Sequence, residues 1–396
     1  MFSRRTAWHL EPDLLAARRD DCLDLTISNP TAVGFTYPAE FYRRLTDERS
    51  ASYEPDPFGL PEARAAVAAH YAARAPGLAL DPAAIGLCAS TSEAYSHLLA
   101  LLCDPDDVVL VPQPGYPLLR VLAELAQATL IPYPLLHDGH WSIDLAALAE
   151  ILDRTPRVRA VVVVAPNNPT GNYLRPHELP ALHALLAPRD VALLVDEVFW
   201  DYPLADVPRP TPVTVPSPCL TFVLSGLSKV AALPQLKLAW WLALGPPELV
   251  RAALARLELI ADTFLGAATP VQHALPHILA ATPAMQAQIS RRTLANLTHL
   301  RDTCAGSAVS VLDVDAGWLA LLRLPAVLDP PGSSDLIDAA WADHLAAHAR
   351  VLVQPGHLYD LPGAHLAVSL LTRESVLATA LDRLLHTVAE VLACEP

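Results

Sequence analysis

The feature that most constrains this chain is a series of short apolar runs that alternate with helix-like segments through its middle. Seven runs of strand length occur between residues 85 and 243, and helix-forming stretches separate most of them. Parallel strands need such long crossovers, whereas antiparallel strands can be joined by tight turns. The alternation therefore predicts an α/β fold with a mainly parallel seven-stranded sheet and helices on both of its faces.

The residue pattern also predicts where the elements of this region lie. Pro61, Pro117 and Pro176 fall at or near the first turns of predicted helices, where a missing N–H costs little. We expect strands at 85–87, 108–111, 129–133, 160–165, 192–196, 221–224 and 239–243, and helices at 61–74, 92–102, 117–126, 144–152, 176–186 and 248–257.

The pattern changes after about residue 285. Long amphipathic helices are expected near 286–303 and 335–348, with short strands at 309–314, 319–324 and 366–370. This mixture is typical of a smaller α+β domain. We therefore expect three parts, namely an N-terminal arm with part of the small domain at 1–45, a large domain at 46–285 and a small C-terminal domain at 286–396.

Composition argues against several classes of partner. The formal net charge of −15 argues against nucleic acid and anionic lipid, which need a concentrated positive surface. The six cysteines lack metal-ligand spacing and fit free thiols in a reducing cytosol. No apolar run approaches the roughly 20 residues of a membrane helix, and no apolar stretch follows the first arginines as it would in a secretory signal. We expect a cytoplasmic protein with no metal, membrane or nucleic-acid partner.

Polar residues follow three of the apolar runs. Asn168, Asp196 and Lys229 each stand at or just beyond the end of a predicted strand. Open α/β sheets bind ligands at the carboxyl ends of their strands. An amide, a carboxylate and an amine are therefore expected in one crevice, where an amine shielded from water suits Schiff-base chemistry.

Taken in order, the motifs at these positions resemble those of a known family. Asn-Pro-Thr-Gly stands at 168–171, Asp-Glu-Val at 196–198 and Ser-Lys at 228–229, with a basic residue eight positions later. The set is similar to that of the fold-type I pyridoxal-phosphate enzymes, specifically the class I/II aminotransferases, over about residues 25–371. The resemblance implies pyridoxal 5'-phosphate as cofactor, bound by the large domain, and a small domain built from both chain ends. It also implies a ping-pong transfer of an amino group between an amino acid and a 2-oxo acid.

The resemblance assigns expected roles to single residues. Lys229 forms the Schiff base and then carries the proton, while Asp196 keeps the pyridine nitrogen charged. Asn168 donates to the ring hydroxyl and Tyr116 stacks on the ring. Tyr53 reaches the phosphate of the neighbouring subunit, which implies a homodimer with shared active sites. The expected phosphate ligands are a helix N-terminus, nearby hydroxyls and one basic side chain, namely Ser90, Thr91, Ser92, Ser225, Ser228 and Lys237.

Several of these residues also have ordinary structural interpretations. The hydroxyl run at 90–92 is typical of a helix N-cap, and the polar stretch at 167–171 is typical of a turn. Tyr53 and Tyr116, taken singly, are as typical of packing as of ligand contact.

Two departures from the family pattern lie on the cofactor side. Phe199 stands where a tyrosine usually donates to the ring hydroxyl, so either Tyr202 replaces it or this donor is absent. Gly226 stands where a serine usually binds phosphate, which leaves Ser225 or Ser228 for that role.

Two further departures lie on the substrate side. Ser28, next to Asn29, replaces a glycine that is frequent in the family. Ala367 stands where an arginine usually binds the substrate carboxylate. We take Arg373 as the replacement, with Arg323 as the weaker choice, because a carboxylate in a partly dry pocket needs a charged donor.

The missing arginine keeps other reactions open. A C–S or β-lyase, a racemase, a decarboxylase or an oxidase would begin with the same cofactor chemistry on the same fold. A third hypothesis is a non-catalytic regulator that senses a ligand through the bound cofactor.

Overall fold

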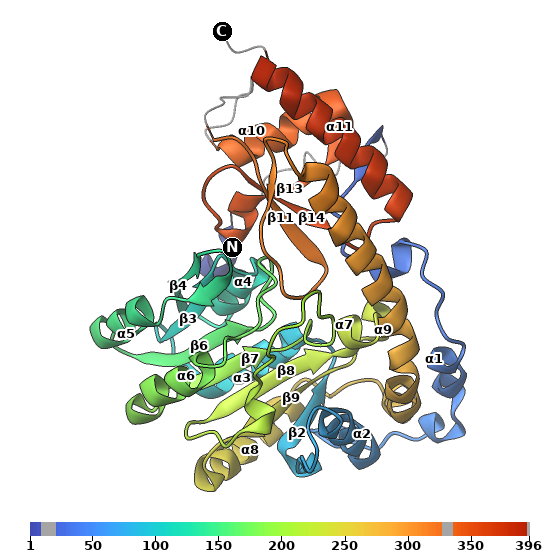
Figure 1. The fold of residues 1–396 in the computed structure, drawn as a ribbon. Coiled ribbons are helices and arrows are strands. Elements are labelled where there is room, and N and C mark those ends of the chain that lie inside the picture. Colours follow the sequence, from blue (N-terminus) through green and yellow to red (C-terminus); the bar gives the residue numbers. More distant parts are fainter. Residues whose placement is uncertain (9–20, 327–335, 394–396) are drawn as a thin grey trace.

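An eight-stranded mixed sheet is the largest element of the fold, and helices cover both of its faces (Figure 1). The computed structural model describes residues 1–8, 21–326 and 336–393. The strands stand in the order β2 (Ile85–Cys88), β9 (Ala239–Leu244), β8 (Thr221–Gly226), β7 (Ala192–Asp196), β6 (Val158–Val164), β3 (Val108–Gln113), β4 (Thr129–His137) and β5 (Trp141–Ile143).

Parallel pairing dominates the middle of this sheet. β8, β7, β6, β3 and β4 are parallel to one another in that order. β9 is antiparallel to both β2 and β8, and β5 is antiparallel to β4. The predicted α/β fold and its seven strands are confirmed, but the count was one strand short. β5 has only three residues, too few to show an alternating pattern.

Three of the helices that cover this sheet begin where local chemistry favours a helix start. The Ser90 side chain accepts the Glu93 N–H at 3.1 Å, and the Asp144 side chain accepts the Ala147 N–H at 2.9 Å. Pro61 is the first residue of its helix. The helices are α2 (Pro61–Ala72), α3 (Thr91–Leu102), α4 (Leu118–Leu125), α5 (Leu145–Arg154), α6 (Glu178–Leu186) and α8 (Pro247–Asp262), with a short α1 (Glu40–Arg43) and α7 (Leu227–Val230).

Strand β6 illustrates how the two faces of the sheet are buried. Val161 and Val163 pack with Leu148 of α5 on one face, whereas Val162 packs with Leu98 of α3 on the other. Successive side chains of a strand point to opposite faces, so a strand covered on both sides reads as a continuous apolar run. This explains why the sequence alone predicted a strand at the position of β6.

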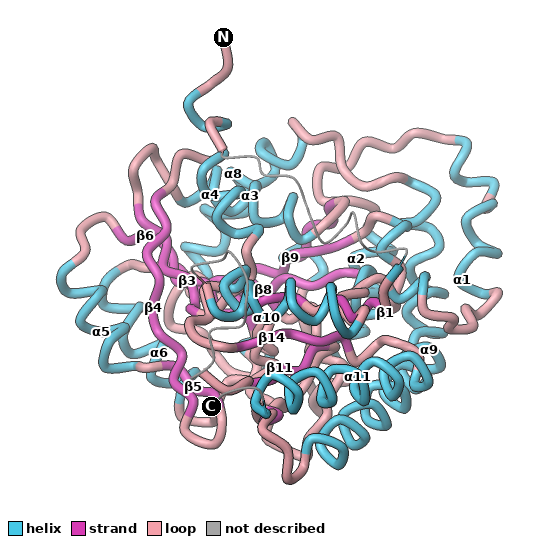
Figure 2. Tube along the Cα trace, turned by 90° about the horizontal axis from the view of Figure 1, so that it is seen from above, coloured by secondary structure: helices cyan, strands magenta, loops and turns pink. Residues whose placement is uncertain are grey.

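A smaller antiparallel sheet lies above the first one in Figure 1. Figure 2 shows α9 and α11 side by side along one edge of the molecule, and side chains of both helices share one apolar core with this sheet. Near the start of the chain, β1 (Leu23–Asp24) pairs in parallel with β12 (Val351–Leu352). The strand order is β10 (Ser310–Val311), β11 (Leu319–Arg323), β14 (His365–Ser369) and β13 (Gln354–Pro355), packed with α9 (Thr269–Cys304), α10 (Ile337–His344) and α11 (Glu374–Ala393).

The second half of the chain differs from the prediction in several details. Helix α11 was missed, although its buried Leu377, Leu381, Leu384 and Val388 have helical spacing. The strand expected at 309–314 is reduced to two residues. The helix expected at 335–348 is α10, which runs from Ile337 to His344 and is followed by a π-helical turn at Leu345–Ala349, while residue 335 lies outside the described part of the chain. Position 285 falls inside α9, and the proposed domain limits stay a prediction.

Other expectations from composition concern single groups. Five of the six cysteines are free thiols, and Cys394 lies outside the described residues. Within the described ranges, no helix combines the length and the apolar character needed to cross a bilayer. In the same ranges, no group of three or more His, Cys, Asp or Glu side chains is arranged to hold a metal ion.

Candidate active site

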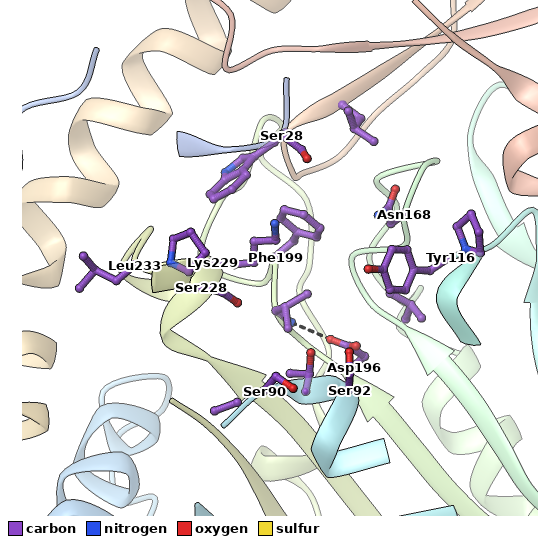
Figure 3. Close-up of a pocket in the computed structure, with 18 of the residues that line it drawn as sticks. Ser28, Ser90, Ser92, Tyr116, Asn168, Asp196, Phe199, Ser228, Lys229 and Leu233 are labelled. Carbon is purple, nitrogen blue, oxygen red and sulfur yellow. Dashed lines mark hydrogen bonds between the residues drawn. The ribbon is translucent and has the colours of Figure 1, made fainter. Parts of the chain in front are cut away.

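A cavity of about 490 Å³ lies between the large sheet and the small sheet. Its lower wall comes from the carboxyl ends of β6, β7 and β8 and from the start of α3, as the parallel topology requires. Figure 3 shows Lys229 in the middle of this cavity, with Ser28 above it and Ser90, Ser92 and Asp196 below. The strands therefore bring Asn168, Asp196 and Lys229 to one pocket, as the sequence predicted.

Lys229 lies in the short helix α7, directly after β8. Its Nζ lies 4.9 Å from the centre of the Trp318 ring and 5.4 Å from that of Phe199. No hydrogen bond or ion pair joins this amine to any residue that the structure describes. Burial lowers the pKa of Lys229 to about 8, against the opposing effect of the Asp196 charge. Near neutral pH an appreciable fraction of the amine is thus uncharged.

Asp196 ends β7 inside the same pocket. The Tyr95 hydroxyl donates to its Oδ2 at 3.2 Å, and the Val198 N–H donates to its Oδ1 at 3.1 Å. Burial raises the pKa of Asp196 to about 6, although both hydrogen bonds act in the other direction. A buried carboxylate with no cation within 4 Å among the described residues fits a ligand that carries a charged N–H, such as a pyridinium. Tyr95 was missed because no motif marks it, although it lies only five residues after the Ser90 cap.

The start of α3 forms the floor of the pocket. Ser90, Thr91 and Ser92 all line it, and Lys237 and Ser228 line it from the neighbouring chain segments. Ser90 caps the helix, so the structural interpretation is correct, and the hydroxyl run faces the pocket as well. Free N–H groups at a helix start together with a lysine suit an anionic group such as a phosphate.

Asn168 and Tyr116 stand together on one side of the pocket (Figure 3). The Asn168 Oδ1 atom is buried and has no hydrogen-bond partner among the described residues. The neighbouring Asn167 instead holds the turn, since its amide donates to the Pro114 carbonyl at 3.1 Å and to the Thr170 hydroxyl at 2.7 Å. The turn interpretation therefore applies to Asn167, while the Asn168 amide is left for a ligand.

Tyr202 does not take the place of the missing tyrosine at position 199. Its hydroxyl donates to the backbone carbonyls of Lys229 at 2.6 Å and Val230 at 3.3 Å. Its ring packs against Trp318 with centres 5.1 Å apart, and it does not line the pocket. The residue braces the lysine from behind, which corrects the expectation that it contacts the cofactor ring.

The two serines offered in place of Gly226 are not equivalent. Ser228 lines the pocket, whereas Ser225 is fully buried in β8 and does not. A Cβ atom at Gly226 would lie 2.7 Å from the Ala239 Cβ atom. Close packing against β9 therefore explains why a glycine stands there, and Ser225 is not brought to the site.

Only some of the residues that we expected to contact the substrate or the partner's cofactor line the pocket. Ser28 lines the pocket, but the Asn29 side chain caps a neighbouring turn by accepting the Thr31 N–H at 3.0 Å. Tyr53 is 70% exposed and lies outside the pocket.

Arg373 is exposed at the start of α11 and does not line the pocket either. Its guanidinium lies beside the backbone of Gly34 instead. Arg323 is exposed on β11, where it is paired with His365 and also lies outside the pocket. The expected arginine clamp for a carboxylate is therefore not formed by either residue, because neither side chain reaches the pocket.

Four residues of the upper wall of the pocket, namely Leu319, Gln354, Leu358 and Tyr359, were missed in the sequence. This wall consists of Trp318 and Leu319 at the start of β11 and of Gln354, Leu358 and Tyr359 from the segment around β13. No local motif marks these residues, because only the pairing of β11, β14 and β13 assembles them.

Comparisons with known proteins identify relatives of this chain. The tyrosine aminotransferase of Homo sapiens is 28% identical over 298 residues, which cover 73% of this chain and 63% of that protein, so the match spans less than two thirds of that relative. The alanine aminotransferase of Mycobacterium bovis is 29% identical over 404 residues, which cover 97% of this chain and 89% of that protein.

Solved structures share the fold and the family profile covers most of the chain. An alanine aminotransferase from Pyrococcus furiosus superposes with a TM-score of 0.88 at 20% identity, over 98% of this chain and 100% of that chain. The family model described as aminotransferase class I and II matches residues 21–384. This chain therefore belongs to the class I and II aminotransferase family.

Proposed function

We propose that this protein is a pyridoxal-phosphate-dependent aminotransferase that moves an amino group between an amino acid and a 2-oxo acid. The observation that carries the proposal is that a buried amine, Lys229, and a buried carboxylate, Asp196, lie in one pocket, at the ends of adjacent strands. The relatives named above are aminotransferases, and none of them favours a lyase, racemase, decarboxylase or oxidase.

The pocket has a suitable group for each part of the cofactor. Asp196 would hold the ring nitrogen, Asn168 would donate to the ring hydroxyl, and Tyr116 would cover one ring face. The hydroxyl run at 90–92, with Ser228 and Lys237, would hold the phosphate. When bound, pyridoxal phosphate supplies an aldehyde that takes up an amino group and a ring that withdraws electrons from the substrate carbon.

Lys229 has the properties of a residue that moves a proton. Because its pKa is lowered to about 8, its amine can both accept and release a proton near neutral pH. Phe199 and Trp318 flank the amine and keep water from it. Tyr202 fixes the backbone carbonyl of Lys229, which keeps the side chain aimed into the pocket.

The proposal includes a cytoplasmic homodimer. Tyr53 presents its ring to the exterior, 70% exposed, where a second copy of the chain could receive it. In a dimer with shared sites, this tyrosine would contact the phosphate in the partner's pocket.

The composition of the chain makes the covalent part of this proposal easy to test. Lys229 and Lys237 are its two lysines, and both line the pocket. Borohydride reduction of the protein loaded with pyridoxal phosphate should place the cofactor on Lys229, as mapped by mass spectrometry of peptides. Attachment to Lys237 would contradict the proposal, and Lys237→Arg should leave the attachment site unchanged.

The same preparation tests the reaction class. On addition of an amino acid without an acceptor, an aminotransferase converts its cofactor stoichiometrically to the amine form and releases one 2-oxo acid. A lyase, racemase or decarboxylase would turn over repeatedly and leave the cofactor in the aldehyde form. A spectral screen of the common amino acids therefore separates these outcomes and identifies the donor together.

A further inference from the structure

The pocket holds few charged groups that a substrate carboxylate could use. Among the described residues that line it, the ionised side chains are Asp196, Lys229 and Lys237. Under the proposed function the two lysines are occupied, one with the aldehyde and the other with the phosphate. A carboxylate in a partly dry pocket still needs a donor, because an unpaired buried charge is costly.

The small sheet places one side chain where such a donor is needed. Leu321, Ala367 and Gln354 lie opposite one another in a row across β11, β14 and β13. Paired residues project from the same face of a sheet, and so do residues two apart in a strand. Leu319 and Gln354 both line the pocket, so this is the face that looks into it. Ala367 lies on that face, but its methyl group can hold nothing.

The amide of Gln354 is oriented by a neighbour. The Tyr359 hydroxyl donates to the Gln354 Oε1 atom. The backbone carbonyl of Tyr359 in turn accepts the Gly115 N–H at 3.0 Å, which ties this segment to the loop that carries Tyr116. Because Oε1 is occupied, the amide nitrogen is the part of Gln354 that is left to donate, and it makes no hydrogen bond with any residue that the structure describes.

We propose that Gln354, held by Tyr359, binds the carboxyl group of the amino-acid substrate through its amide N–H. The inference rests on the proposed function and adds a residue that determines specificity. An uncharged donor binds a carbonyl oxygen in the same way whether that oxygen belongs to a carboxylate or to a carboxamide. The pocket therefore recognises an acceptor oxygen and not a negative charge. It also accepts substrates in which a carboxamide replaces the carboxyl group.

The experiment uses the holoenzyme and matched pairs of donors that differ at this group alone. The pairs are L-alanine with L-alaninamide, L-leucine with L-leucinamide and L-phenylalanine with L-phenylalaninamide. Single-turnover conversion of the cofactor is followed by its visible absorbance over a range of donor concentrations. We expect the rate constant at low concentration to differ by less than about tenfold within each converted pair, the scale of one ordinary hydrogen bond.

Introducing a negative charge at position 354 is the most decisive test. Gln354→Glu keeps the contact with Tyr359 but repels a carboxylate, and it can accept the N–H of an amide. The ratio of acid to amide should fall by on the order of 100-fold or more, the scale of a like-charge contact. Tyr359→Phe, which frees the amide to rotate, should weaken both donors several-fold. Gln127→Glu adds the same charge at an exposed position outside the pocket and should leave the ratio unchanged.

The outcomes separate this inference from the function on which it rests. An acid-to-amide ratio that Gln354→Glu leaves unchanged would overturn the role of Gln354 alone. So would a wild-type preference for the acid on the order of 1000-fold, which needs a charged donor and can be measured even if the variant does not fold. Conversion of no donor, in these pairs or in the screen of the common amino acids, would reject the aminotransferase proposal itself, and this inference with it.

Discussion

The two walls of the pocket are built in different ways. The wall from the large sheet presents polar side chains at the ends of successive strands, each within a short local run of strand, turn and helix start. The wall from the small sheet presents Trp318, Leu319, Gln354 and Tyr359, which come from segments joined only by strand pairing. Under the proposed function, the wall from the large sheet, here the first wall, would hold the groups for chemistry, and the wall from the small sheet, the second wall, would hold the groups that meet the substrate. Changes to the first should therefore lower kcat, and changes to the second should raise KM.

The largest effect is expected from removing the amine. Lys229→Ala should lower kcat by more than about 10⁴-fold, because both the covalent anchor and the proton carrier are lost. Steady-state assays with the donor found in the spectral screen will measure it. Retention of a tenth of the activity would show that the first wall does not hold the chemistry. Added methylamine, which can replace the missing amine, should restore part of the rate.

A smaller loss is expected from neutralising the carboxylate. Asp196→Asn keeps the size of the side chain but removes the charge that would hold the ring nitrogen protonated, so kcat should fall by about 10²–10³-fold. Tyr95→Phe removes one hydrogen bond to the same carboxylate and should cost several-fold at most. Equal losses in the two variants would contradict the role given to the charge.

The reactivity of Lys229 should depend on pH in a characteristic way. An ordinary lysine amine has a pKa near 10.4, whereas burial lowers that of Lys229 to about 8. Only the neutral amine reacts, so acetylation of Lys229 in the cofactor-free protein should rise through a midpoint near pH 8, about two units below an ordinary lysine. Quantitative mass spectrometry at a series of pH values will test this. A midpoint near 10 would show that the amine is not desolvated.

A substitution of Tyr202 tests whether its hydrogen bonds stabilise the backbone around Lys229. Tyr202→Phe removes hydrogen bonds to the carbonyls of Lys229 and Val230, so the free energy of unfolding should fall by about 1–2 kcal/mol with a several-fold loss of kcat. Urea denaturation will measure the stability. The pH titration of the cofactor's visible band should be unchanged in this variant, whereas Phe199→Tyr should shift it downwards. A shifted titration in Tyr202→Phe together with an unchanged one in Phe199→Tyr would indicate that Tyr202 donates to the ring hydroxyl.

The smallest effect is expected on the second wall. Leu358 is 45% exposed and lines the pocket, so Leu358→Ala removes only part of an apolar contact. KM for an apolar donor should rise by about 2–5-fold while kcat stays unchanged. A fall in kcat with constant KM would contradict the assignment of substrate contacts to the second wall and of chemistry to the first.

Much of the first wall was predictable because its signals are local. The apolar runs of β6, β7 and β8 mark buried parallel strands, and the residues that follow each run must emerge at one edge of the sheet. Tyr95 was missed, since its contact with Asp196 spans 101 positions of sequence and depends on how α3 lies on the sheet.

The sequence by itself determined the α/β fold, the strands of the large sheet and the identity of the amine, the carboxylate and the amide in the pocket. Those features follow from periodicity and turn chemistry over a few residues. Tertiary structure alone decided that Tyr202 faces the backbone of Lys229, that Arg373 faces the outside and that Gln354 stands beside Ala367. The direction of a side chain depends on strand register and on neighbours that are distant in the chain, and no local pattern encodes either of them.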